Sequence, residues 1–229
     1  MKNTEVKKFV EYVTTHKLVK KNDKILVGVS GGVDSMTLLY LLHEVREIFK
    51  IEVGAAHVNY SLRGDDSDKD QKVVENFCKK NNIPCFVNKL KLKSQLKHDS
   101  LQVKAREVRY EFYDKICNSN GYNKIAIAHN ANDNAETVLL NLFRGSGIEG
   151  LKGIPVRREN IFRPLIYMKR EEILDFAKAN KIKFRHDKSN FKDIYKRNFV
   201  RIKLFPLIET RINASVIDNI NQFSQIFSE

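Results

Sequence analysis

A turn rich in serine and glycine follows an apolar segment near the start of the chain. Residues 25–29 are apolar, and a helical pattern begins near Asp34. The turn between them reads Ser30, Gly31, Gly32, Val33, Asp34 and Ser35. Adjacent glycines let the backbone approach an anion, and the next helix offers free N–H groups and a positive dipole. The turn is therefore predicted to bind phosphate, or alternatively to be an ordinary turn in which Asp34 or Ser35 caps the helix.

The spacing of the glycines excludes two common nucleotide-binding loops. The sequence contains no G-x-x-x-x-G-K-[ST] pattern, so the turn is not a Walker-type loop. No G-x-G-x-x-G pattern follows the strand, which excludes the usual dinucleotide fingerprint.

Two carboxylates lie three residues apart at the start of a later helix. Asp133 and Glu136 share one face of that helix, where they are able to hold Mg²⁺ or orient an ammonium group. The alternative is that they are acidic residues favoured by the helix dipole. Arg106 and Arg109 share a face of another helix, where one of them would neutralise phosphate charge. Their alternative role is in surface salt bridges.

Five apolar segments alternate with helical patterns and must position these groups. The predicted strands cover residues 25–29, 51–58, 84–90, 123–129 and 161–165. The predicted helices cover 4–20, 34–46, 70–81, 101–118 and 133–145, and the polar segment 61–69 is expected to be mobile. This alternation predicts an α/β fold with a doubly wound parallel sheet of about five strands. Ligands of such sheets bind at the carboxyl ends of the strands, which is where the groups above are expected.

Positive charge is concentrated in two parts of the chain. The net charge is +13 over 229 residues, and the segments 79–109 and 152–203 carry most of the excess. Such concentration favours a polyphosphate partner, because each neutralised phosphate releases counterions. The alternative is a solvated basic surface. From Lys169 onward the pattern is helical and basic, so residues 1–168 are predicted to form a nucleotide-binding catalytic domain and 169–229 a small basic helical appendage.

The sequence has an odd number of cysteines, and Cys78, Cys85 and Cys117 are widely spaced. They suit a reducing cytoplasm better than a disulfide framework. No apolar stretch reaches the roughly 18 residues of a membrane helix, so no membrane association is expected. His57 and His129 end predicted strands, and we interpret them as structural.

The turn at Ser30–Ser35 resembles the pyrophosphatase loop of enzymes that cleave ATP between its α- and β-phosphates. Further segments resemble the tRNA(Ile)-lysidine synthetase family within that group. They are His57–Arg63, Ala105–Tyr110, His129–Thr137, Arg163–Leu165, and a later series of Asp187, Asn190, Arg197, Asn198 and Arg201. The first of them departs from the family pattern at Tyr60, where histidine is usual.

The resemblance implies an adenine nucleotide alpha hydrolase fold and a reaction in two steps. ATP would adenylate the wobble cytidine of tRNA(Ile) with a CAU anticodon, and L-lysine would then replace AMP. It also implies that Ser30–Ser35 hold ATP and that Asp133 and Glu136 hold Mg²⁺. The implied catalytic residues are Asp34, Arg109, Asp133, Glu136 and Arg201. Residues 169–229 would contact the tRNA.

Two alternatives stay open at this point. One is an ATP-dependent ligase of the same fold that acts on small molecules, and the other is a basic RNA-binding module without catalysis. Sulfur transfer is disfavoured because the sequence has no C-x-x-C pair.

Overall fold

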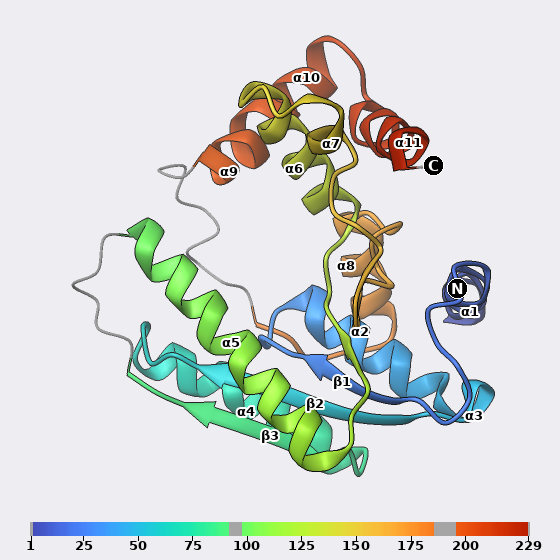
Figure 1. Ribbon diagram of the computed structural model, residues 1–229, viewed down its shortest axis with the longest axis vertical. Helices are drawn as coiled ribbons and strands as arrows, with labels where there is room; N and C mark the ends of the chain where they lie inside the picture. The colour runs from blue at the N-terminus through green and yellow to red at the C-terminus, as the bar shows by residue number, and fades with distance from the viewer. Residues whose placement is uncertain (1, 92–97, 186–195, 229) are drawn as a thin grey trace.

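The strands form one sheet, which lies in the lower part of the view in Figure 1. They are β1 (Lys24–Gly28), β2 (Glu52–Asn59), β3 (Cys85–Lys89), β4 (Lys124–Ala126), β5 (Arg157–Arg158) and β6 (Ile161–Phe162). In this computed structural model, which describes residues 2–91, 98–185 and 196–228, their order is β3-β2-β1-β4-β6-β5. All neighbours pair in parallel except β5 and β6. The predicted parallel α/β sheet is therefore confirmed, with β5 as an additional strand.

The helices connect the strands and then continue beyond the sheet. The first group is α1 (Lys2–Thr15), α2 (Val33–Glu44), α3 (Arg46–Phe49), α4 (Asp65–Lys80) and α5 (His98–Asn120). The second group is α6 (Ala131–Phe143), α7 (Gly147–Leu151), α8 (Arg170–Ala179), α9 (Lys196–Phe199), the π-helical turn η2 (Val200–Leu204), α10 (Phe205–Arg211) and α11 (Val216–Ser228).

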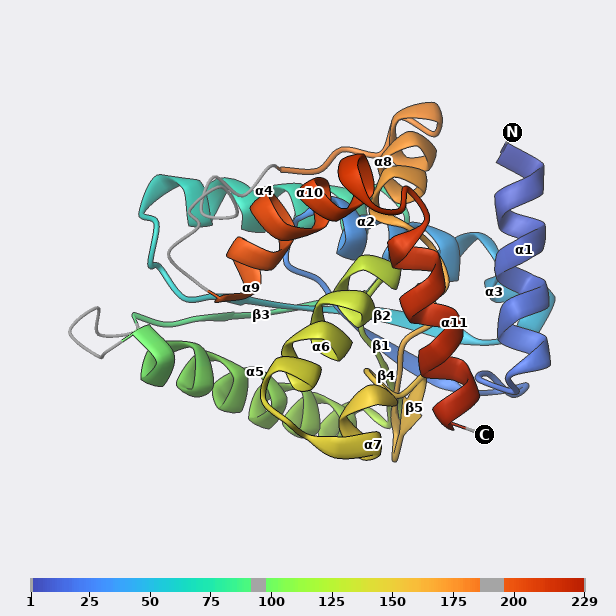
Figure 2. The same ribbon diagram turned by 90° about the horizontal axis from the view of Figure 1, so that it is seen from above.

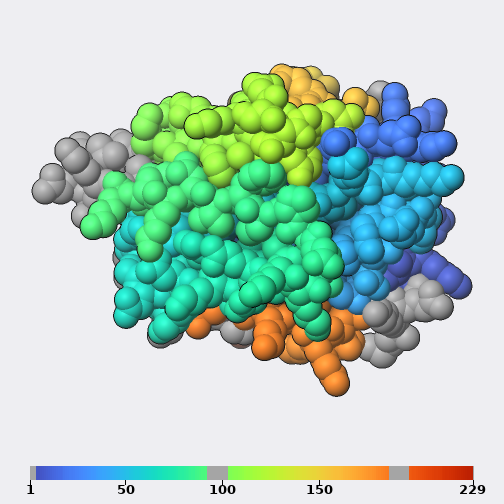
Figure 3. Space-filling model, turned by 90° about the horizontal axis from the view of Figure 1, so that it is seen from below, coloured from blue at the N-terminus to red at the C-terminus, as the bar shows by residue number. Residues whose placement is uncertain are grey.

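Alternate residues of each strand pack on opposite faces of the sheet, as expected for a pleated strand. Ile25 and Val27 of β1 lie in a core shared with α1, α2, α4 and α8, whereas Leu26 lies in a second core with α5. Figure 2 shows α5 on one side of the sheet and α2, α4 and α8 on the other. Viewed from below, β3 lies at the sheet edge between α4 and α5 (Figure 3). Both faces are covered, so the wound arrangement is as predicted.

A third, smaller core joins the C-terminal helices to α6. It contains Ala135, Val200, Phe205 and Ile217. Helix α8, by contrast, places Ile173 and Phe176 in the main core. The predicted division at residues 168 and 169 stays a prediction.

The structure differs from the expected elements in two places. The helix predicted over 70–81 begins earlier, at Asp65, within the polar segment 61–69. Its first turn contains Asp65, Asp66 and Asp68, which the positive end of the helix dipole favours. Strand β5 consists of two exposed arginines and has no apolar alternation to reveal it. No helix among the described residues is long and apolar enough to cross a membrane.

Candidate active site

The turn after β1 is held in shape by its own serines. The Ser35 hydroxyl accepts a hydrogen bond from the Ser30 backbone N–H at 3.1 Å and donates one to the Gly32 carbonyl at 3.0 Å. Gly31 has a φ of +89°, which favours glycine, and an added Cβ would lie 3.1 Å from the Asp70 carbonyl oxygen. Gly32, not Asp34 or Ser35, is the N-cap of α2 and makes no side-chain cap bond. The first N–H groups of α2 are therefore available to an anion.

A cavity of about 760 Å³ opens beside this turn. Its lining comprises Ser30, Gly32, Val33, Asp34, Arg63, Asp70, Arg109, Asp133, Arg170, Leu174, Arg185, Arg201 and Ile202. The fold thus gathers the predicted loop, Arg109, Asp133 and Arg201 around one space. Gly31 and Ser35 are buried behind the lining.

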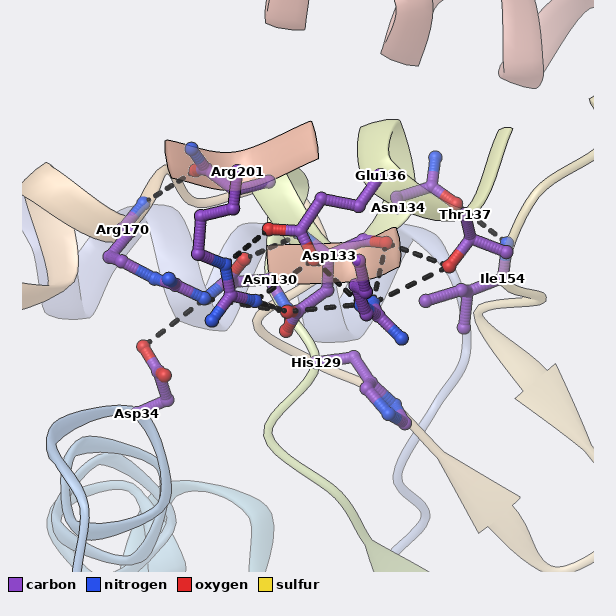
Figure 4. Close-up of polar contacts among 12 residues, drawn as sticks. Asp34, His129, Asn130, Asp133, Asn134, Glu136, Thr137, Ile154, Arg170 and Arg201 are labelled. Atoms are coloured by element: carbon purple, nitrogen blue, oxygen red, sulfur yellow. Dashed lines mark hydrogen bonds and ion pairs between the residues drawn. The ribbon is translucent and has the colours of Figure 1, made fainter. Parts of the chain in front are cut away.

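Asp133 caps helix α6 and also lines the cavity. Asn130 and Asp133 form a capping box at the start of α6, in which one Asp133 oxygen accepts from the Asn130 N–H at 3.1 Å. The other oxygen accepts from Arg201 at 3.1 Å and from Arg170 at 3.4 Å (Figure 4). Asp133 therefore caps α6 and also lines the cavity, and its catalytic role stays a prediction.

Glu136 is only 1% exposed and binds two arginines from the C-terminal segment. Its Oε1 lies 2.6 Å from Arg201 Nε, and its Oε2 lies 2.7 Å from Arg197 Nε. Arg197 and Arg201 are four residues apart on α9 and η2, so both reach the same carboxylate. Glu136 thereby holds this segment against α6, and Arg201 also lines the cavity.

This arrangement does not fit Mg²⁺ held by Asp133 and Glu136. All four carboxylate oxygens already accept hydrogen bonds, from Asn130, Arg170, Arg197 and Arg201. Among the described residues, no group of three His, Cys, Asp or Glu side chains is placed to hold a metal ion. Asp133 and Glu136 therefore hold arginine side chains in this structure.

Asp34 extends toward the same cluster from the Ser30–Ser35 turn, which is called the phosphate loop below. Its Oδ1 accepts a hydrogen bond from the Asn130 amide at 3.2 Å. Burial raises the pKa of this carboxyl above its ordinary value, and the nearby positive charges of Arg170 and Arg201 oppose that shift. The loop thus carries a partly desolvated carboxylate beside two guanidinium groups.

A second cluster, which was not predicted, lies beside Gly31 of the loop. The buried Asp70 carboxylate accepts from Arg63 at 2.6 Å and from Arg185 at 3.2 Å. The Arg185 backbone N–H also donates to the Gly31 carbonyl at 2.9 Å. Arg63 belongs to a segment singled out above, but nothing local marks Asp70 or Arg185. Asp70 thereby holds two cavity-lining arginines beside the phosphate loop.

Replacing Asp70 with asparagine is expected to weaken ATP binding roughly tenfold, because a neutral amide loses one charge-assisted bond of about 1.5–3 kcal/mol. Calorimetric titration with ATP measures this affinity. Asp175→Asn, at an exposed carboxylate 4.0 Å from Lys178, is the matched control and should bind ATP normally. Equal affinities in the two variants would contradict the role given to Asp70.

The two arginines of the predicted α5 face differ in whether they line the cavity. Arg109 lines the cavity, whereas Arg106 is exposed and lies over the Tyr110 ring at 5.0 Å.

His57 is buried with its Nδ1 2.8 Å from the Val29 carbonyl, and burial lowers its pKa. His129 Nδ1 accepts from Arg163 at 3.0 Å, and burial lowers the pKa of this imidazole to about 3. Both imidazole rings are therefore held by contacts within the fold, in line with a structural role.

Comparison with known proteins agrees with this geometry. The family model described as PP-loop domain matches residues 1–208. A curated tRNA(Ile)-lysidine synthase from Chlorobaculum tepidum is 40% identical over 227 residues, which are 98% of this chain and 68% of that protein. The chain belongs to the tRNA(Ile)-lysidine synthase family of PP-loop proteins.

Other members of the tRNA(Ile)-lysidine synthase family are longer. The protein from Clostridium perfringens is 42% identical over 221 residues, covering 95% of this chain and 47% of that one. The protein from Clostridium tetani is 44% identical and is covered to 46%. The chain thus spans about half the length of these curated relatives.

Solved structures show the same fold at low sequence identity. The U34-tRNA thiolase NcsA from Methanococcus maripaludis has a TM-score of 0.78 and 19% identity, covering 100% of this chain and 80% of that chain. The NH3-dependent NAD synthetase from Campylobacter jejuni has a TM-score of 0.56 and 14% identity, with coverages of 100% and 97%. These similarities concern the fold alone.

Proposed function

We propose that this chain catalyses the ATP-dependent attachment of L-lysine to the wobble cytidine of tRNA(Ile) with a CAU anticodon. One observation carries the proposal: a single cavity joins the phosphate loop to a cluster of arginines and carboxylates. The names of the relatives support the choice of substrates.

The first step would be adenylation of the base. The cytosine carbonyl oxygen attacks the α-phosphate of ATP, an O–P bond forms, and pyrophosphate leaves. The loop N–H groups and the Ser30 hydroxyl would hold phosphate oxygens. Arg109 and Arg201 line the cavity and would stabilise the developing negative charge.

The second step would be displacement of AMP. The ε-amino group of lysine attacks the activated ring carbon, a C–N bond forms, the C–O bond to AMP breaks, and the amine loses a proton. Asp34 and Asp133 line the same cavity and would attract the cationic amine. The reaction needs no covalent nucleophile, so positioning and electrostatics supply most of the catalysis.

ATP would enter as its magnesium complex, and we assign no step to Mg²⁺. We place this activity in the cytoplasm, where tRNA is modified and where Cys78, Cys85 and Cys117 would stay as the free thiols seen here.

The basic residues of 169–229 are proposed to contact the tRNA backbone. Arg197 and Arg201 are paired with Glu136. The contact with the tRNA backbone is therefore proposed for exposed side chains such as Lys196 and Lys203. Lys188 and Lys192 lie outside the described residues.

The double variant Lys196→Glu with Lys203→Glu is expected to weaken tRNA binding and to flatten its salt dependence. Each lost phosphate contact on a duplex reduces the slope of log K against log salt by about 0.9. Filter binding between 50 and 200 mM salt, roughly the range in which the effect is large, measures both quantities. ATP affinity should stay at the wild-type value, since neither lysine lines the cavity. An unchanged slope would place the RNA surface elsewhere.

Pyrophosphate release tests the proposed function against its alternatives. With ATP and L-lysine present, release should depend on added tRNA(Ile). A ligase for small molecules would release pyrophosphate without tRNA, and a binding module would bind ATP without releasing any. Either of those outcomes would overturn the proposal.

A further inference from the structure

Tyr60 stands where the family pattern has histidine, directly after the last residue of β2. That position is at the carboxyl edge of the sheet, where ligands bind in this fold. Tyrosine and neutral histidine both offer a hydrogen-bond acceptor on a ring. Tyrosine in place of histidine therefore keeps a hydrogen-bond acceptor at this position and changes the length of the side chain.

The Tyr60 hydroxyl contacts one turn of α5 through two hydrogen bonds. It donates its only hydrogen to the Ala105 carbonyl at 2.7 Å. It accepts from Arg109 Nε at 3.2 Å, and the Arg109 guanidinium carbon lies 5.9 Å from the centre of the Tyr60 ring. Because the single hydroxyl hydrogen is used on Ala105, the oxygen can serve Arg109 only as an acceptor.

Arg109 has no carboxylate partner among the described residues within 4.0 Å, unlike the other cavity-lining arginines Arg63, Arg170, Arg185 and Arg201. The hydrogen bond and the ring contact described for its side chain are both with Tyr60. A neutral acceptor at Nε fixes the plane of the guanidinium without neutralising its charge. The four terminal N–H groups then stay available to a ligand in the cavity.

We propose that Tyr60 is a positioning residue that orients Arg109 toward the phosphates of the bound nucleotide. Its effect on catalysis rests on the proposed function, whereas its effect on Arg109 does not. Two measurements separate these claims, and both use the intact chain.

The first measurement follows the Arg109 Nε–H directly by ¹H–¹⁵N NMR, with the signal assigned by its loss in Arg109→Lys. A hydrogen bond slows exchange of this proton with water. In Tyr60→Phe, which keeps the ring and removes the acceptor, exchange should accelerate about tenfold, the factor that corresponds to about 1.4 kcal/mol. Tyr122→Phe, beyond the other end of α5, should leave the exchange rate unchanged. Unchanged exchange in Tyr60→Phe would overturn the proposal, whatever the enzyme does.

The second measurement is a double-mutant cycle on tRNA-dependent pyrophosphate release. Tyr60→Phe should lower kcat roughly 10- to 100-fold, the scale of a misplaced catalytic group, and should change the KM for ATP less than threefold on the same scale. In the Arg109→Ala background the same substitution should have no further effect, because the side chain through which Tyr60 acts is missing. Additive losses would show that Tyr60 acts independently of Arg109 and would overturn the proposal. Accelerated exchange in a chain that never releases pyrophosphate would instead refute the proposed function and leave the orientation of Arg109 by Tyr60 standing.

Discussion

Asp34→Asn is expected to lower tRNA-dependent pyrophosphate release by about 10²–10³-fold, the usual loss for one electrostatic group of an active site. The asparagine keeps the oxygen that accepts from Asn130 and removes only the charge. Steady-state release of pyrophosphate at saturating ATP measures the loss. Turnover within threefold of wild type, on that same scale, would remove Asp34 from the catalytic set.

The same variant should be more stable than the wild type at pH 7. Burial raises the pKa of Asp34 in the folded protein, so its ionised form disfavours folding. That cost is fully present above the folded pKa and disappears as the pH falls below the unfolded value near 3.9. The stability difference measured by urea unfolding should therefore shrink from pH 7 toward pH 4. A variant less stable than wild type at pH 7 would show that the carboxylate is favourably paired.

Glu136→Ala is expected to release the C-terminal segment from α6. Removing one partner of a fully buried ion pair costs about 3–5 kcal/mol, and we expect about 2–3 kcal/mol because Arg197 and Arg201 are partly exposed. Activity should fall about 10²-fold as Arg201 loses its position. Urea unfolding and pyrophosphate release measure the two effects. Glu149→Ala, in a surface pair with Lys152, is the control and should change neither.

Magnesium titration distinguishes this account of Glu136 from a metal-binding role. If Glu136 fastens Arg197 and Arg201, raising the Mg²⁺ concentration should not restore activity to Glu136→Ala. Restoration at high Mg²⁺ would instead identify Glu136 as a metal ligand and would mean that the arginine contacts are exchanged for the ion during the reaction.

The parts of the site that follow strands could be predicted from the sequence. Buried strands leave strong apolar signals, and the carboxyl ends of parallel strands meet at one edge. Ser30–Ser35 and Asp133 were therefore expected to lie near one another although about a hundred residues separate them. The pairing of Arg197 and Arg201 with Glu136 was not foreseen, since charge patterns give spacing along a helix but not the element that packs against it.

The site residues that the sequence did not predict make contacts with polar side chains far away in the chain. Asp70 and Arg185 meet only because the chain after α8 returns to the phosphate loop, and neither has a distinctive neighbour in sequence. The unusual residue Tyr60 was visible in the sequence, but its hydrogen bonds to Ala105 and Arg109 depend on how α5 packs on the sheet. Such contacts emerge from tertiary packing, which local patterns do not encode.

Transfer of labelled lysine to tRNA tests the central claim most directly. The chain would be incubated with ATP, radiolabelled L-lysine and an unmodified tRNA(Ile) transcript with a CAU anticodon, and the label in tRNA would be counted. A transcript that differs only in the first anticodon base, with GAU, is the matched control. We predict ATP-dependent label in the CAU transcript alone. Pyrophosphate release without any label in tRNA, or equal labelling of both transcripts, would contradict the proposed activity.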